Sequence, residues 1–203
     1  MWERPLIVCA APVEDGGLCD AVIGVGKAAA AMRATELLVR ARPAWLLLVG
    51  VCGAYPGSGL EVGALCVVGG DRLADEGIEL GAGEFRGIAA MGLGAEGPFL
   101  AEAARTRAIA GRLGIREVAG ATVSTCSACD ERSRALEGRS GAQVETMEGA
   151  AVLLVCQHLG VPAVQLRVVS NRTGAREAAG WDLHGALRRL HAAVRGLKEE
   201  HGW

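Results

Sequence analysis

The stretch VETMEGAAVLLVCQHLGVPAVQLRVVSN, residues 144–171, contains both kinds of element that decide the fold. Residues 147–159 are apolar and rich in alanine, which predicts a buried helix. A short break follows, and residues 162–170 form an apolar run of the kind found in strands that are buried on both faces. A buried helix followed directly by such a strand is typical of α/β proteins, so this stretch predicts an α/β fold.

The same alternation of strand and helix patterns extends over the rest of the chain. Apolar runs predict strands at residues 5–10, 20–25, 44–51, 62–69 and 118–125, helical patterns lie at 27–40, 98–113 and 181–197, and a glycine-rich hairpin region covers 78–94. Pro98 is expected in the first turn of its helix. No linker, repeat or low-complexity tract interrupts the pattern, so we expect residues 1–203 to form a single domain. We expect a three-layer α/β/α fold with a mixed, largely parallel central sheet.

Charge and hydropathy exclude several classes of protein. The chain has 203 residues, a formal net charge of −2 and 51 % hydrophobic residues. This charge, without basic runs, offers no electrostatic surface for nucleic acid or an anionic membrane. No apolar run reaches the roughly 20 residues that a transmembrane helix needs, and no basic segment leads into a signal-type apolar stretch. We therefore expect a cytoplasmic protein that binds neither nucleic acid nor membranes.

The seven cysteines do not form a recognisable framework. Their number is odd and most lie within apolar runs, which free thiols in a reducing compartment explain better than disulfides do. Cys126 and Cys129 form a CxxC motif. A zinc site would need a second pair or suitably spaced histidines, and the first histidine is only at position 158. We expect neither a metal site nor a redox pair.

The sequence GVGKAA at residues 24–29 fits a loose dinucleotide-binding fingerprint. The acidic residue that should end the next strand is missing, and Ala28 excludes a complete phosphate-binding P-loop. We therefore interpret the glycines as a tight turn from a strand into a helix and expect no cofactor.

Polar residues stand at the predicted strand ends, where α/β folds bind their ligands. Glu14 follows the first strand, the glycine-rich loop 50–57 follows another, and Ser170 and Asn171 end the last. Each also has an ordinary interpretation, as a solvated charge, a turn or a turn asparagine. Glu148 also has an ordinary interpretation, because a carboxylate at the start of a helix stabilises the helix. Beside a buried helix, however, its carboxylate needs partners, and the two hydroxyls of a ribose can donate to one carboxylate.

Three segments together resemble the superfamily of nucleoside phosphorylases and nucleosidases: GVGKAAAAM at 24–32, LLLVGVCGAYPGSGLEVGALCVV at 46–68, and residues 144–171. Within it, the ending is most similar to the futalosine hydrolase family, where SN is followed by a variable loop and WD, here Trp181 and Asp182. The resemblance implies a nucleoside phosphorylase-like fold and hydrolysis of an N-glycosidic bond through an oxocarbenium-like state. It also implies a small nucleoside substrate and a homodimer or larger homo-oligomer.

The resemblance further implies roles for individual residues. Glu14 matches the loop glutamate that activates the attacking water. Glu148 matches the glutamate that holds the ribose hydroxyls, with Met147 packed against the sugar. Residues 124–129 are expected to line the base and residues 51–53 to lie beside the ribose. The expected substrate-binding residues are Val51, Cys52, Gly53, Ala128, Cys129, Met147, Glu148 and Ser170. The 5′ carboxyphenyl group of futalosine predicts an apolar pocket that also contains a basic residue.

Asn171 departs from the adenine-cleaving relatives, which have Asp at this place. An Asp can accept from the 6-amino group of adenine, whereas an Asn amide offers two donors. These suit the O6 and N7 acceptors of hypoxanthine, so we expect Asn171 to recognise a 6-oxopurine and count it with Glu14 as catalytic. Because an amide cannot donate a full proton, either water protonates the base or the base departs as a hydrogen-bonded anion.

Three alternatives remain: two are related enzymes, and one is a protein of another class. A phosphorylase of this superfamily has an arginine loop after the first strand to bind phosphate. Here that loop reads APVEDGG, residues 11–17, whose two carboxylates would repel phosphate, so hydrolysis is favoured. The others are a nucleosidase for methylthioadenosine or S-adenosylhomocysteine and a nucleoside-binding protein without turnover, which the intact Glu14 and Glu148 disfavour.

Overall fold

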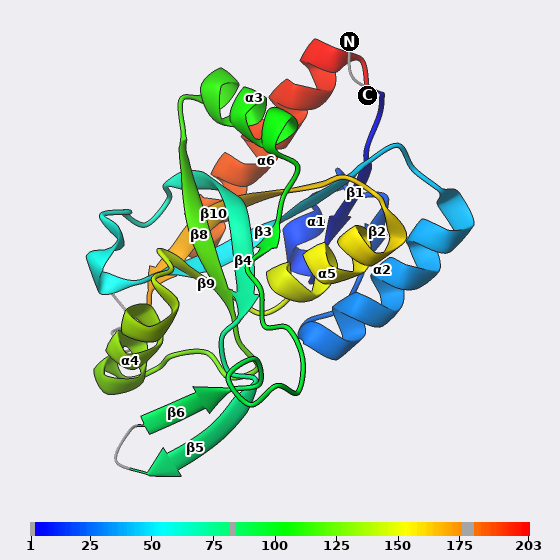
Figure 1. Cartoon of the computed structure of the whole chain (residues 1–203). Helices are drawn as coiled ribbons and strands as arrows, with labels where there is room; N and C mark the ends of the chain where they lie inside the picture. Colours follow the sequence, from blue (N-terminus) through cyan, green and yellow to red (C-terminus); the bar gives the residue numbers. More distant parts are fainter. Residues whose placement is uncertain (1–2, 82–83, 176–180) are drawn as a thin grey trace.

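The computed structural model describes residues 3–81, 84–175 and 181–203. Its main feature is a twisted mixed sheet with helices packed around it (Figure 1). The strands are β1 (Leu6–Cys9), β2 (Ala21–Val22), β3 (Leu46–Ala54), β4 (Leu65–Leu73), β5 (Gly77–Gly81), β6 (Glu84–Gly87), β7 (Phe99–Leu100), β8 (Arg116–Thr122), β9 (Val144–Thr146) and β10 (Ala163–Arg172). The helices are α1 (Pro12–Asp15), α2 (Lys27–Ala41), α3 (Ala103–Leu113), α4 (Asp130–Ser140), α5 (Gly149–Leu159) and α6 (Leu183–His201). None of the described helices has the length and apolar character needed to cross a membrane.

Five strands of the sheet close on themselves, which the sequence pattern did not predict. β10 pairs in parallel with β3 on one side and antiparallel with β4 on the other. From β4 the ring continues through β8 and β9, and β9 returns antiparallel to β3. β1 and β2 extend the sheet from β3, and β7 pairs with β4. The mixed α/β sheet is therefore confirmed, but the three-layer description is incomplete because part of the sheet forms a closed barrel.

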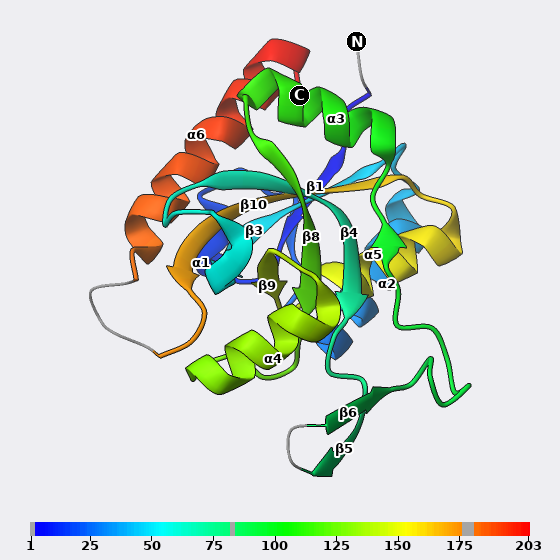
Figure 2. The same cartoon turned by 60° about the vertical axis from the view of Figure 1, so that its left-hand side comes forward.

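The apolar strands are buried on both faces. Along β3, Leu47 and Val49 pack on the face covered by α6, whereas Leu46 and Leu48 pack on the face covered by α2 and α5. Figure 2 shows α6 and the pair α2 and α5 on opposite sides of the sheet. Continuous apolar runs are the pattern expected for strands covered on both sides. This packing fixes the carboxyl ends of β1, β3 and β10 relative to one another.

Several element boundaries differ from those predicted. α3 begins at Ala103 rather than near Pro98, because the Glu102 carboxylate accepts hydrogen bonds from the N–H groups of the first helical turn. Phe99–Leu100 forms the short strand β7 instead. α6 begins at Leu183, with Asp182 as its N-cap, rather than at residue 181.

Three short elements were not predicted at all. The sequence of α4, DERSRALEGRS, has no apolar stripe, and only Ser133 and Leu136 are buried. α1 covers just four residues and contains Glu14. β9 has three residues, VET, directly before the segment for which the sequence predicts a helix. None of these segments is long enough, or periodic enough, to give a clear pattern.

Candidate active site

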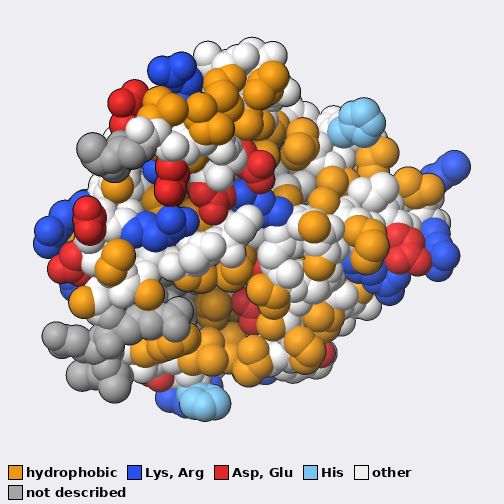
Figure 3. Space-filling view, turned by 90° about the horizontal axis from the view of Figure 1, so that it is seen from below, with side chains coloured by type: hydrophobic (Ala, Val, Ile, Leu, Met, Phe, Trp, Pro, Cys, Tyr) orange, Lys and Arg blue, Asp and Glu red, His pale blue; other side chains and the backbone are white. Residues whose placement is uncertain are grey.

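A cavity lies at the carboxyl ends of β1, β3 and β10, as expected for ligand sites in α/β folds. Figure 3 shows a hollow with hydrophobic side chains in its depth and acidic side chains at its wall. The lining residues are Ala10, Ala11, Val13, Glu14, Val25, Val51, Cys52, Gly53, Cys126, Ser127, Glu145, Thr146, Met147, Glu148, Ser170, Asn171, Trp181 and Leu183. The structure thus brings together residues from the first loop, the middle of the chain and its last third.

The Glu14 carboxylate is buried and held by three main-chain donors. Its Oε2 accepts hydrogen bonds from the N–H groups of Ala10, at 3.0 Å, and Ala11, at 2.9 Å. Its Oε1 accepts one from the N–H of Val51, at 2.8 Å. Because Glu14 lies in the first turn of α1, its side chain reaches back to the preceding main chain. Oε1, with only one donor, can accept a further hydrogen bond.

Arg167 places a positive charge next to Glu14. Its side chain is completely buried, and its Nε and Nη2 donate to Oε1 of Gln165 at 3.3 and 3.1 Å. Gln165 in turn donates to Asp71 at 3.2 Å. Nη1 of Arg167 makes no hydrogen bond with the described residues. It and Oε1 of Glu14 each lie 2.7 Å from the position that a Cβ on Gly50 would occupy, so glycine is required there. Arg167 lies in the middle of an apolar run, and nothing in the sequence pattern predicts a role for it.

Glu148 lies on the other side of the cavity, at the start of α5. Only 5 % of it is exposed, and its Oε1 accepts a hydrogen bond from the N–H of Gly26 at 2.9 Å. Burial raises the pKa of Glu148 above its ordinary value, and the charge of Glu14 acts in the same direction. The positive charge of Arg167 and the N–H of Gly26 oppose this rise. Met147 lines the cavity next to Glu148.

Ser170 and Asn171 end β10 at the cavity. The Ser170 hydroxyl donates to Oδ1 of Asn171 at 2.8 Å, and Nδ2 of Asn171 donates to the carbonyl oxygen of Arg172 at 2.9 Å. These two contacts fix which end of the amide is oxygen and which is nitrogen. They also occupy one of the two N–H groups, so a ligand can receive only one hydrogen bond from this amide.

Glu145, which the sequence analysis did not assign, is a third carboxylate at the cavity. It is buried, and its Oε1 accepts a hydrogen bond from the N–H of Ser127 at 2.8 Å. Its Oε2 accepts from the Ser127 hydroxyl at 2.5 Å and from the Tyr55 hydroxyl at 3.1 Å. Burial, together with the charge of Glu145, raises the pKa of Tyr55 above its ordinary value. Tyr55 therefore remains a neutral donor to Glu145.

The base-lining segment differs from the expectation by two residues. Cys126 and Ser127 line the cavity, whereas Ala128 and Cys129 are exposed and lie outside its lining. The physical reason is that the chain turns away after Ser127 to begin α4, with Cys129 as its N-cap. The other expected substrate-binding residues, Val51, Cys52, Gly53, Met147, Glu148 and Ser170, all contribute to the lining.

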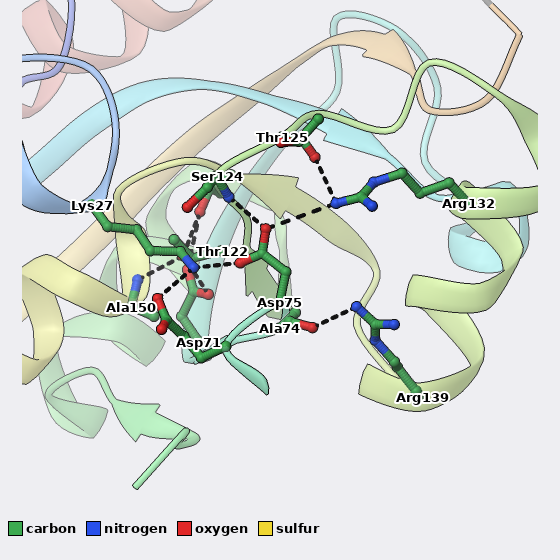
Figure 4. Close-up of polar contacts among 12 residues, drawn as sticks. Lys27, Asp71, Ala74, Asp75, Thr122, Ser124, Thr125, Arg132, Arg139 and Ala150 are labelled. Carbon is green, nitrogen blue, oxygen red and sulfur yellow. Dashed lines mark hydrogen bonds and ion pairs between the residues drawn. The ribbon is translucent and has the colours of Figure 1, made fainter. Parts of the chain in front are cut away.

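An ion-pair cluster connects the start of α2 to the segments that follow β4 and β8 (Figure 4). Lys27, which follows the glycine turn at Gly26, pairs with Asp75 and, at 2.9 Å, with Glu76. Asp75 also accepts a hydrogen bond from the N–H of Ser124 at 2.7 Å. The lysine of the GVGK sequence is therefore used in an ion pair, which supports the interpretation of this sequence as a turn.

The cysteines of the described residues are present as free thiols. None of the seven, all of which lie in the described ranges, forms a disulfide. Among the described residues, the one group with metal-ligand atoms close together is Cys9, Asp15 and Cys19. A hydrogen bond with Cys9 and burial raise the pKa of the Cys19 thiol above its ordinary value.

The rim of the cavity is apolar, but its described lining contains no basic residue. The side chains of Val13, Val25 and Trp181 are each about half exposed. They line the cavity together with Leu183. Neither lysine nor arginine is present among the described lining residues. The basic residue expected for a substrate carboxylate is thus not found in the described part of the cavity.

Comparison with known proteins agrees with this arrangement. Residues 13–198 match the phosphorylase superfamily. A futalosine hydrolase of Thermus thermophilus is 37 % identical over 182 residues, which cover 88 % of this chain and 80 % of that protein. A futalosine hydrolase of Streptomyces coelicolor is 37 % identical over 134 residues, which cover 66 % of this chain and 56 % of that protein.

Solved structures show the same fold at lower identity. The structure of a futalosine hydrolase mutant of Helicobacter pylori has a TM-score of 0.80 at 19 % identity and covers 96 % of this chain and 97 % of that one. A methylthioadenosine nucleosidase mutant from the same species, with 5′-methylthioadenosine in its active site, has a TM-score of 0.82 at 20 % identity. The coverage there is 98 % of this chain and 100 % of that one.

Proposed function

The chain belongs to the phosphorylase superfamily and, within it, to the futalosine hydrolase family, and from this premise we propose that it hydrolyses the N-glycosidic bond of futalosine. The products would be hypoxanthine and dehypoxanthine futalosine, in a step of menaquinone biosynthesis. The reaction is N-glycosyl hydrolysis, with water as the second substrate.

The charge of the cavity is the observation that favours hydrolysis over phosphorolysis. Its described lining contains Glu14, Glu145 and Glu148 but no lysine or arginine. A phosphate nucleophile is normally bound by charge-assisted donors, and three carboxylates would repel it. A water molecule, in contrast, can donate a hydrogen bond to a carboxylate. We therefore infer that water attacks the sugar.

We place the attacking water at Oε1 of Glu14, the carboxylate oxygen that has only one main-chain donor. Three fixed N–H groups hold Glu14, so it can orient the water without rearranging. As the bond to C1′ forms, the water gives its proton to Glu14, which acts as general base. The positive charge of Arg167 lies next to Glu14, on the same side of Gly50, and stabilises the anionic site before this transfer.

Glu148 supports the proposal on the ribose side. When ionised, its carboxylate can accept hydrogen bonds from both ribose hydroxyls, and Met147 lines the cavity next to it. A negative charge held close to the ribose also stabilises the oxocarbenium-like character that develops as the base departs. Burial places this charge in a medium of low polarity, which strengthens the effect.

Asn171 supports the proposal on the base side. Its remaining N–H can donate to the departing purine and stabilise the negative charge that collects there. An amide does not transfer a proton, so the purine receives its proton from water, either during departure or after leaving as an anion. This assignment separates the chain from nucleosidases that have an acid at the same place.

The test is to incubate the purified protein with futalosine, inosine and methylthioadenosine, each with and without phosphate, and to measure the released base. We expect hypoxanthine from futalosine at the same rate in both buffers. In water enriched in ¹⁸O, the label should appear at C1′ of the sugar product. Strict dependence on phosphate would contradict hydrolysis, and preference for methylthioadenosine would favour the alternative nucleosidase.

We also propose that the protein acts in the cytoplasm as a homodimer or larger homo-oligomer. The support in the structure is apolar surface on α2, where Met32 is 70 % and Val39 is 57 % exposed. Light scattering on the purified chain measures the mass directly, and a monomer at assay concentration would contradict the proposal.

A further inference from the structure

Asn171, Gly53 and Glu145 form one row across three neighbouring strands. Gly53 of β3 pairs with Asn171 of β10 on one side and with Glu145 of β9 on the other. Residues paired in this way direct their side chains to the same face of a sheet. A Cβ on Gly53 would lie 2.8 Å from Cγ2 of Thr173, 3.4 Å from Nδ2 of Asn171 and 3.9 Å from Cβ of Glu145. All three residues line the cavity.

The row places a polar residue on each side of Gly53, which has no side chain of its own. Neighbouring strands lie about 4.8 Å apart, so the main chains of the two outer residues are about 10 Å apart. The methyl group of Thr173 occupies the space next to Gly53, so a purine ring would lie in the part of the cavity that all three residues of the row line. A base in this position would meet an amide at one edge and a carboxylate at another.

Asn171 alone does not distinguish hypoxanthine from adenine. One of its N–H groups is bound to the carbonyl oxygen of Arg172, and its Oδ1 is bound to the Ser170 hydroxyl. The single N–H that remains can donate to N7, which is an acceptor in both purines. Selection of a 6-oxopurine therefore requires a second group that contacts another atom of the base.

Glu145 has the hydrogen-bonding capacity for this role. Its Oε2 already accepts two hydrogen bonds, from Tyr55 and Ser127, but its Oε1 accepts only the one from the N–H of Ser127. An ionised carboxylate is only an acceptor, and Oε1 has room for one more donor. Hypoxanthine has a hydrogen on N1, whereas N1 of adenine is an acceptor that a carboxylate would repel.

We propose that Glu145 is the residue that selects 6-oxopurine over 6-aminopurine nucleosides, with its Oε1 accepting the N1–H of the base while Asn171 contacts the O6 and N7 edge. The inference rests on the proposed function, because it names the base-selecting group of the same cavity. A purely structural role would instead have Glu145 anchor Ser127 and its loop to the sheet.

The experiment compares wild type with Glu145→Gln on futalosine and on its counterpart with a 6-amino group. Gln keeps the length of the side chain and an acceptor for Ser127 but removes the charge. We expect the ratio of kcat/KM for the 6-oxo over the 6-amino substrate to fall about tenfold, because hydrogen bonds to charged groups are stronger and the repulsion of adenine N1 is relieved. An unchanged ratio, with both activities lowered alike, would overturn the proposal.

Ser127→Ala is the matched control, because it removes the hydroxyl contact to Oε2 and leaves Oε1 in place. It should lower both activities by a similar factor and leave the ratio within about twofold of wild type. A fall in the ratio as large as that of Glu145→Gln would mean that loop anchoring, not the carboxylate, sets the preference, and would overturn the proposal.

A measurement on the wild-type protein does not depend on variants that fold. Hypoxanthine, 1-methylhypoxanthine and adenine are compared as inhibitors, and hypoxanthine should bind at least about tenfold more tightly than the other two. Equal inhibition by hypoxanthine and 1-methylhypoxanthine would overturn the role of Glu145. If wild type hydrolyses the 6-amino substrate and not futalosine, the proposed function itself is wrong.

Discussion

The N–H of Gly26 donates a hydrogen bond to Oε1 of Glu148 at 2.9 Å, although the two residues lie 122 positions apart. Gly26 has a φ of 89°, which side-chain-bearing residues rarely adopt, and it is also the N-cap of α2. The turn that resembles a nucleotide-binding fingerprint therefore orients a carboxylate of the cavity. The backbone N–H of Gly26 therefore holds the Glu148 side chain in place.

Gly26→Ala should lower kcat/KM for futalosine about tenfold or more, because strain at this φ displaces the N–H from Glu148. The loss should appear mainly as a higher KM if Glu148 binds the ribose. Gly92→Ala is a matched control, since Gly92 also has a positive φ and open space around its Cα but lies outside the cavity lining. Equal losses in the two variants would remove the special role of Gly26.

The activity should fall on the acid side at a pH above the ordinary range of glutamate. Burial raises the pKa of Glu148, so the carboxylate becomes protonated as the pH falls through that value and loses acceptor capacity for the ribose hydroxyls. Because the charge of Arg167 opposes this rise, Arg167→Met should move the acid limb to higher pH, whereas Arg167→Lys should move it less. A pH profile of kcat/KM measures both, and an unmoved limb in Arg167→Met would contradict the assignment.

Glu14→Gln should lose both activity and stability. The carboxylate accepts three main-chain hydrogen bonds, and an amide nitrogen in place of one oxygen would face an N–H group. We expect about 1–3 kcal/mol of destabilisation, measured by denaturant unfolding. The kcat should fall about 10²–10⁴-fold, as for loss of a general base. Asp15→Asn, next in sequence but outside the cavity lining, should keep kcat within a few-fold of wild type.

Asn171→Asp should lower kcat/KM for futalosine about 100-fold. One carboxyl oxygen would face the carbonyl oxygen of Arg172, which forces the new carboxyl group to hold a proton there and leaves no N–H for the base. Ser170→Ala should have a smaller effect, because it keeps the Asn171 amide and removes only the hydroxyl contacts to Oδ1 of Asn171 and to the carbonyl oxygen of Cys52. Losses for Asn171→Asp no larger than those for Glu14→Asp would contradict a role in base recognition.

The strand ends that form the cavity could be predicted from the sequence because the signals there are local. Glu14, Glu148 and Asn171 each stand directly after an apolar run or before one, and all three line the cavity. Their chemical roles, like the single domain, remain predictions. Ala128 and Cys129 were misplaced because the sequence does not show where a loop turns away from a pocket.

Glu145, Arg167 and the closure of the barrel could not be predicted for different physical reasons. Glu145 lies on a strand of three residues, too short for an alternating pattern. Arg167 lies within an apolar strand. Its charge can be understood only from the folded structure, where Glu14 lies close to it at Gly50. Closure depends on β10 pairing with both β3 and β4, and no local signal reports such long-range pairing.

The pairing of β10 with both β3 and β4 also has a consequence for how the chain folds during its synthesis. The ribosome makes β10 after every other strand, yet β10 carries Asn171 and joins β3 to β4. Contacts between distant segments form slowly, since a long loop of chain must close first. A nascent chain that lacks β10 therefore has its first loop and its Glu14 but no complete cavity, and we expect the capacity to bind nucleoside to arise only after β10 has paired with β3 and β4.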